Sequence, residues 1–276
     1  MARDQQIAEL TIDPLFFAEL VLMGTVTGFL AGLLGIGGGM IQVPFLTTML
    51  ATRGVAGELS IKMAIATAMA TIVFTSLASV RAHHRHGAVR WDIVRAMSPG
   101  IVAGGVIAGA GMFALIKGPT LGIVFALFVG YSATQMLINR KPRATRVLPP
   151  RWGQAAVGSA IGLLSGLVGA GGAFMTVPFM SWCNVPLHRA VGTAAALGFP
   201  IALASTLGYV VGGWSLPPSI PGAFGYLYLP ALAIVAAASV TMAPLGARAA
   251  HAMNVQAFRR LFAVLMYGVA GYMAWR

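Results

Sequence analysis

The sequence has few charged residues, and few of those are acidic. Only 9% of its 276 residues are charged, as 18 Lys and Arg and 6 Asp and Glu, whereas 58% are hydrophobic. A soluble domain normally carries about a quarter charged residues. So few charges exclude a water-soluble globular fold, and the high hydrophobicity excludes disorder. The apolar runs also lack the two-residue alternation that the strands of a membrane β-barrel need.

Cysteine and buried acidic residues are nearly missing as well. Cys183 is the only cysteine, which excludes a disulfide framework within the chain. No Asp or Glu lies deep in an apolar segment, and the nearest, Glu19, stands at a segment start. Intramembrane carboxylates are the usual means of binding cations or relaying protons. Their absence argues against a cation centre, and we expect neither a metal nor a cofactor.

Ten apolar segments are present, and they predict an all-α polytopic membrane protein. A helix needs about 20 residues to cross the hydrocarbon core. Two segments, 38–52 and 172–184, are too short to cross alone, and each follows a glycine cluster. We predict that each forms a helical hairpin with the segment before it. The ten segments are residues 15–34, 38–52, 63–80, 96–116, 120–138, 154–170, 172–184, 190–213, 228–247 and 260–275.

The two halves of the chain resemble each other. Residues 24–46 and 158–180 match at 11 of 23 positions without a gap, and seven of the matches are Gly or Pro. A weaker match between 64–68 and 190–194 pairs Thr67 with Thr193. Such matches predict a duplicated unit, each copy a glycine-broken hairpin plus three transmembrane helices. The predicted parts are a first repeat at 1–138, a basic linker at 139–151 and a second repeat at 152–276.

Basic residues set the predicted orientation of the two repeats. The basic loops 81–95, 139–151 and 248–260 should face the cytoplasm, and the uncharged loop 214–227 should face outward. With Arg189, thirteen of the 18 Lys and Arg residues then lie inside, so the net charge of +12 reflects orientation rather than nucleic-acid binding. This orientation inverts the second repeat and places both termini outside. Inverted repeats are typical of secondary transporters that bind substrate near the membrane midplane.

The denser glycine runs, GIGGG at 35–39 and GAGGA at 169–173, predict two broken helices. Each glycine disfavours a helix by about 1 kcal/mol relative to alanine. A helix that restarts after a break exposes unpaired N–H groups, which attract anions. The alternative is that the runs are tight turns and that nearby hydroxyls bond their own helix backbone. The predicted substrate-binding residues are Gly37, Gly38, Gly39, Gln42, Thr67, Gly171, Gly172, Thr176 and Thr193.

Other small and basic residues have plainer interpretations. Glycines spaced by four, at 24, 28 and 32 and again at 158, 162 and 166, predict close helix packing. His83, His84 and His86 lie among arginines, which favours contact with anionic lipid over a metal tract.

The paired motifs GFLAGLLGIGGGMIQVPFL and GLLSGLVGAGGAFMTVPFM resemble the signature of the TauE/SafE family of permeases, which occurs once in each half. The second copy has Ala173 where the first has Gly39. The resemblance implies an inner-membrane permease for a sulfur-containing anion such as sulfite, thiosulfate or an organosulfonate. It leaves open which anion is carried, the direction of transport, a coupling ion and the oligomeric state.

Three functions compete at this stage. A passive anion channel, or a permease for a non-sulfur organic anion, would have a similar sequence, because backbone dipoles select anions in both. An intramembrane enzyme would need a nucleophile with a base, or a metal, inside the bilayer. The histidines lie only in a loop or at segment ends. We therefore expect a transporter, not an enzyme, whose partners are a small anion and the lipid bilayer, and not nucleic acid.

Overall fold

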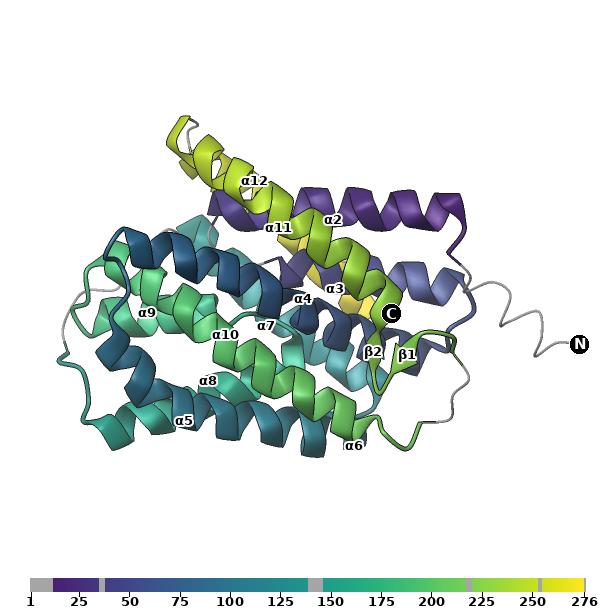
Figure 1. The fold of residues 1–276 in the computed structure, drawn as a ribbon, viewed down its shortest axis with the longest axis horizontal. Coiled ribbons are helices and arrows are strands. Elements are labelled where there is room, and N and C mark those ends of the chain that lie inside the picture. The colour runs from purple at the N-terminus through teal and green to yellow at the C-terminus, as the bar shows by residue number, and fades with distance from the viewer. Residues whose placement is uncertain (1–11, 35–37, 139–145, 217–219, 253–254, 276) are drawn as a thin grey trace, which may run out of the picture.

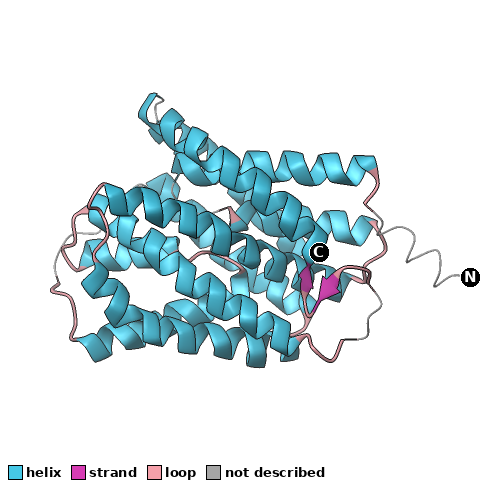
Figure 2. Cartoon of the chain, in the orientation of Figure 1, coloured by secondary structure: helices cyan, strands magenta, loops and turns pink. Residues whose placement is uncertain are grey.

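A computed structural model describes residues 12–34, 38–138, 146–216, 220–252 and 255–275. These residues are almost entirely helical, and the single sheet among them pairs two short antiparallel strands (Figures 1 and 2). The elements are α2 (Pro14–Leu34), α3 (Gly39–Thr52), α4 (Gly57–Arg85), α5 (Trp91–Val106), the π-helix η1 (Ile107–Met112), α6 (Phe113–Leu115), α7 (Gly118–Ile138), α8 (Arg151–Val168), α9 (Ala173–Trp182), α10 (Leu187–Gly212), β1 (Ala223–Phe224), β2 (Leu227–Tyr228), α11 (Leu229–Ala252) and α12 (Val255–Trp275).

The fold is that of an all-α membrane protein, as predicted. Six helical stretches in the described part are long and apolar enough to cross a membrane. Large apolar side chains such as Leu127 and Val211 are exposed on the outside of the bundle, where lipid would cover them.

The two short segments form half-length helices, as predicted. α3 and α9 each contain a proline, Pro44 and Pro178, and each follows a glycine-rich interruption. Short loops therefore lie between the helices in the middle of the bundle as well as at its two ends (Figure 2). In Figure 1, α3 turns back toward the end where α2 began. The inverted placement of the two halves across a membrane stays a prediction.

Each half packs its first helix against a helix of the other half. α2 lies along α11, and α8 lies along α5. Glycine permits both approaches: a Cβ on Gly28 would lie 2.5 Å from the Ser239 carbonyl oxygen, and a Cβ on Gly158 would lie 2.5 Å from that of Met97. These two spaced glycines therefore serve packing, as predicted.

Three predicted segments differ in detail from the structure. The segment predicted at 63–80 extends over the whole of α4, because polar residues continue its helix at both ends. The segment predicted at 96–116 begins at Trp91 and contains the π-helix η1. There Gly109 packs so closely on α10 that an added Cβ would lie 2.7 Å from the Ser205 carbonyl oxygen. The uncharged loop before α11 contains the β1–β2 hairpin.

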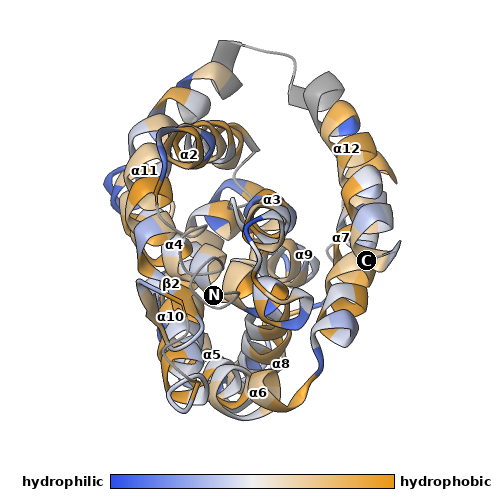
Figure 3. Ribbon diagram, turned by 90° about the vertical axis from the view of Figure 1, so that its right-hand side faces the viewer, coloured by the Kyte–Doolittle hydropathy of each residue, from blue (hydrophilic) through white to orange (hydrophobic). Residues whose placement is uncertain are grey.

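Seen along the helices, α7 and α12 lie together on one side of the molecule (Figure 3). They are joined by a 2.6 Å hydrogen bond between the Thr134 and Tyr267 hydroxyls. α4 and α10 pack against each other and run in opposite directions (Figure 1). The end of α4 and the starts of α5, α8 and α10 share one end of the bundle, so the arginines of these segments gather there.

Candidate functional site

The start of α3 meets the glycine break before α9 in the interior. We call the break between α2 and α3 the first break and that between α8 and α9, at residues 169–172, the second break. A Cβ on Gly39 would lie 2.3 Å from the carbonyl oxygen of Gly169, so the backbones touch. Gly169 and Gly172 have φ of +74° and +73°, a region that favours glycine. Gly38 precedes α3 as its N-cap, and Gly37 lies outside the described residues.

Apolar side chains of α4 cover this contact. The Ile72 side chain lies 3.1 Å from the position that a Cβ on Gly39 would occupy. It lies 3.4 Å from the position that a Cβ on Gly171 would occupy. Ile65 lies 3.1 Å from the same position on Gly169. The free N–H groups at the start of α3 thus face a dry environment, in which their partial positive charge acts strongly on an anion.

One buried polar atom without a hydrogen-bond partner in the described structure lies near each break. Gln42 donates its amide N–H to the Thr27 hydroxyl at 3.1 Å, whereas its Oε1 has no partner. Ser165 is fully buried, and its Oγ lies 3.2 Å from where a Cβ on Gly172 would stand, also without a partner. The described residues contain six buried side-chain atoms without a partner, and these two are the ones beside the breaks, where a ligand would pair with them.

Sequence reasoning named Gln42 and missed Ser165. Ser165 belongs to the small-residue motif of α8, and its counterpart in the first repeat is Ala31. The substitution of serine for alanine four residues before the glycine run is the one signal that could have identified it.

The predicted threonines have different roles. The Thr176 hydroxyl donates to the Gly172 carbonyl at 3.0 Å, which is the bond to its own helix that the alternative interpretation expects. Thr67 accepts the backbone N–H of Tyr228 at 3.0 Å, and Thr193 accepts that of Arg90 at 3.0 Å. These two hydroxyls therefore hold the chain where α11 and α5 begin, and the structure does not direct them at the breaks.

The two half-helices differ in burial. In α3 every residue from Gly39 to Pro44 is buried, whereas in α9 only Thr176 and Met180 are. The start of α9 is thus partly accessible, whereas the start of α3 is enclosed.

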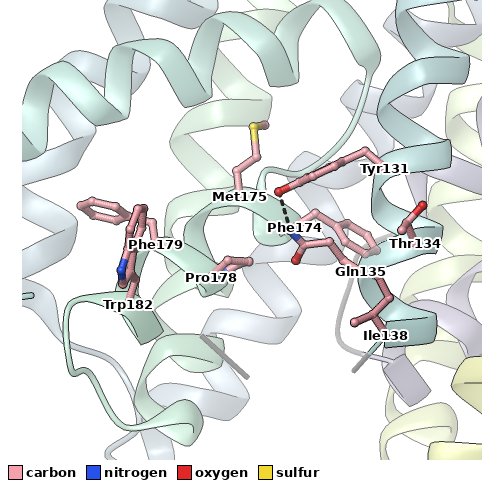
Figure 4. A pocket seen from close by; sticks show the side chains of 9 residues that line it. All are labelled: Tyr131, Thr134, Gln135, Ile138, Phe174, Met175, Pro178, Phe179 and Trp182. Carbon is pink, nitrogen blue, oxygen red and sulfur yellow. Dashed lines mark hydrogen bonds between the residues drawn. The ribbon is translucent and has the colours of Figure 1, made fainter. Parts of the chain in front are cut away.

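A cavity of about 600 Å³ accounts for this difference. It lies between α7 and α9, and Phe174 and Pro178 point from α9 toward α7 (Figure 4). The cavity reaches the first turn of α9 and extends to its last residue. Its lining residues are Tyr131, Thr134, Gln135, Ile138, Phe174, Met175, Pro178, Phe179 and Trp182. At the far end the Arg146 guanidinium lies 4.4 Å from the centroid of the Trp182 ring.

Charged side chains at the opposite end of the bundle are engaged with one another or with backbone. Arg53 pairs with Glu19 at 2.9 Å. Lys62 donates to the Ala114 carbonyl at 3.1 Å, and Glu58 accepts the Gly118 N–H at 3.0 Å. Across the described residues, no three His, Cys, Asp or Glu side chains gather where they could hold a metal ion. The site at the breaks therefore consists of backbone N–H groups, an amide and a hydroxyl.

Comparison with known proteins agrees with the paired glycine motifs. The family model described as "Sulfite exporter TauE/SafE" matches residues 20–273, which is nearly the whole chain. The chain belongs to the TauE/SafE family. This TauE/SafE protein is 34% identical over 257 residues to a probable membrane transporter protein of Haemophilus influenzae, covering 92% of this chain and 97% of the relative.

More distant members of the TauE/SafE family are also named as transporters. The probable membrane transporter protein YunE of Bacillus subtilis is 29% identical, with 71% of this chain and 79% of the relative covered. YdhB of the same organism, also named a probable membrane transporter, is 25% identical with the same coverage. No solved structure shows a significant match.

Proposed function

We propose that this protein is a secondary transporter for a small sulfur-containing anion, such as sulfite, thiosulfate or an organosulfonate, in the bacterial inner membrane. The family and the names of its relatives support membrane transport. The observation that carries the anion assignment is the contact between the start of α3 and the second break, beside which the Ser165 hydroxyl is buried without a partner. N–H groups at a helix start, together with the Ser165 hydroxyl, suit an oxyanion, whereas the unpaired Gln42 Oε1 is an acceptor and needs a donor.

Alternating access is supported by the unequal burial of the two breaks. In a transporter with paired repeats, one side of the site is open while the other is closed. The open α9 and the enclosed α3 fit such a state, with the cavity extending to Trp182, beside Arg146. Movement of the α7–α12 pair relative to the half-helices would then exchange the open and closed sides.

Ligand-dependent thermal unfolding of the purified protein tests the anion assignment. A ligand that binds only the folded state stabilises it by about 2.7 kcal/mol at a hundredfold excess over its Kd. We expect stabilisation by sulfite, thiosulfate or methanesulfonate at constant ionic strength, and none by chloride. Stabilisation by acetate or succinate alone would assign a non-sulfur organic anion, and a response only to divalent cations would contradict the anion site.

Flux into proteoliposomes distinguishes a transporter from a channel. We expect uptake of the stabilising anion to saturate and to accelerate when the same anion is preloaded inside. Uptake that rises linearly with concentration, without acceleration by preloading, would indicate a passive channel instead.

A further inference from the structure

The cavity between α7 and α9 has two chemically different ends. At one end it meets the first turn of α9, where the N–H groups of Ala173 and Phe174 have no acceptor within their own helix. Ser165, which does not itself line the cavity, has a fully buried hydroxyl without a partner beside the N-cap Gly172, the residue before this turn. This end therefore offers hydrogen-bond donors for an anionic head group, and no acidic side chain lines the cavity to oppose it.

The rest of the cavity is mainly apolar. Along α9 its wall consists of Phe174, Met175, Pro178, Phe179 and Trp182, and Ile138 faces them from α7 (Figure 4). The polar Tyr131 and Gln135 side chains hydrogen-bond to each other on the α7 side. Such a surface gains little from a fully hydrated inorganic anion, whereas it gains free energy with each methylene group that it removes from water.

We propose that this cavity is a binding site for the hydrocarbon part of an anionic substrate whose head group lies at the second break. The proposal rests on the proposed function and adds a specific place where substrates with apolar groups are selected. α9 has ten residues and is about 15 Å long at 1.5 Å per residue, so a short alkyl chain fits beside it. A membrane phospholipid would lie the other way round, with its head group near Arg146 and its acyl chain toward the break.

Binding of an n-alkanesulfonate series tests the site. The protein is placed in nanodiscs, and methane-, ethane-, butane- and hexanesulfonate are titrated calorimetrically, with empty nanodiscs subtracted. We expect affinity to rise about three- to fourfold for each added methylene until the cavity is filled.

A pair of adjacent variants locates the effect. Ile138 lines the cavity and its neighbour Leu137 on the same helix does not, although both side chains are partly exposed. Ile138→Trp should abolish the rise in affinity with alkyl chain length, while the affinity for methanesulfonate stays unchanged. Leu137→Trp, the matched control, should keep the gain.

Each other outcome has a distinct meaning. A gain that persists in Ile138→Trp would overturn the proposal, as would affinity independent of chain length in the unmodified protein. If methanesulfonate still binds in either of these two cases, the proposed function as an anion transporter is not contradicted. Failure of every anion to bind would reject the proposed function itself. A phospholipid that native mass spectrometry finds bound, and that hexanesulfonate does not displace, would assign the cavity to lipid and overturn the proposal.

Discussion

At the scale of single residues, the buried polar atoms at the breaks separate a binding role from a structural one. A side chain that holds the fold together has partners within the protein, as Ser239 does in donating to the Gly24 carbonyl between α11 and α2 at 3.0 Å. The Ser165 Oγ is buried to the same degree and has none among the described residues. A buried polar group of this kind lowers stability unless a ligand pairs with it.

Ser165→Ala should therefore weaken anion binding without destabilising the protein. A hydrogen bond to a charged group contributes about 1.5–3 kcal/mol, so we expect binding to weaken about 10- to 100-fold. The melting temperature without ligand should stay constant or rise. Ser239→Ala, the control, should lower the melting temperature and leave the Kd unchanged. A lower melting temperature with normal binding in Ser165→Ala would show that Ser165 is structural.

Glycines at helix contacts give a second prediction at this scale. A Cβ on Gly100 would lie 1.8 Å from the Ala155 carbonyl oxygen, so α5 and α8 cannot keep their spacing in Gly100→Ala. We expect a loss of about 1–3 kcal/mol or more of stability, measured as a lower melting temperature in detergent. Gly130 in α7 has nothing within 4 Å of its Cβ position. Gly130→Ala should be neutral or stabilising, because alanine favours the helix.

At the scale of elements, Thr67 and Thr193 have equivalent roles in the two repeats. Each accepts a backbone N–H from the residues directly before a helix of the other half, α11 or α5. The two threonines that the weak sequence match pairs thus make equivalent hydrogen bonds. These bonds give no support to their predicted contact with substrate. Sequence alone could not separate the two roles, because the donors lie 161 and 103 residues away along the chain.

Thr67→Val and Thr193→Val should each destabilise the protein through the N–H that they leave unpaired. The expected loss is about 1–3 kcal/mol, read as a lower melting temperature. Affinity for the anion, measured below the melting temperature, should stay within about twofold of the unmodified protein if neither hydroxyl touches the substrate. A large loss of affinity with an unchanged melting temperature would return these threonines to the binding site.

Some elements could be predicted from the sequence and others could not, for a physical reason. The half-helices α3 and α9 follow from local glycine chemistry and from segment length. The π-helix η1 depends on the close approach of Gly109 to α10, and the cavity depends on how α7 stands against α9. Contacts between distant segments leave no periodic pattern in either partner, so these features appear only in the folded structure.

At the scale of the whole molecule, the opposite directions of α4 and α10 are the basis for an orientation test. These helices follow the hairpins of the first and second repeat and run in opposite directions (Figure 1). Charge predicts that α4 begins outside and α10 begins inside the cell. Ala56 and His188 are exposed at these two starts, and the single Cys183 can be replaced by serine to give a cysteine-free background.

In that background, Ala56→Cys should react with a membrane-impermeant maleimide in intact cells, and His188→Cys should react only after permeabilisation. Ser215→Cys and His86→Cys, exposed on the predicted outer and inner loops, are the matched controls for the two sides. The physical basis is that arginine-rich segments tend to stay in the cytoplasm, so we expect the end that carries Arg85, Arg90 and Arg189 to lie inside. Labelling of both Ala56→Cys and His188→Cys from outside would place equivalent ends of the two repeats on one side and contradict the inverted arrangement. If every site reacted from the side opposite to the one expected, the repeats would still be inverted. The end that the charge rule assigns to the cytoplasm would then face outward.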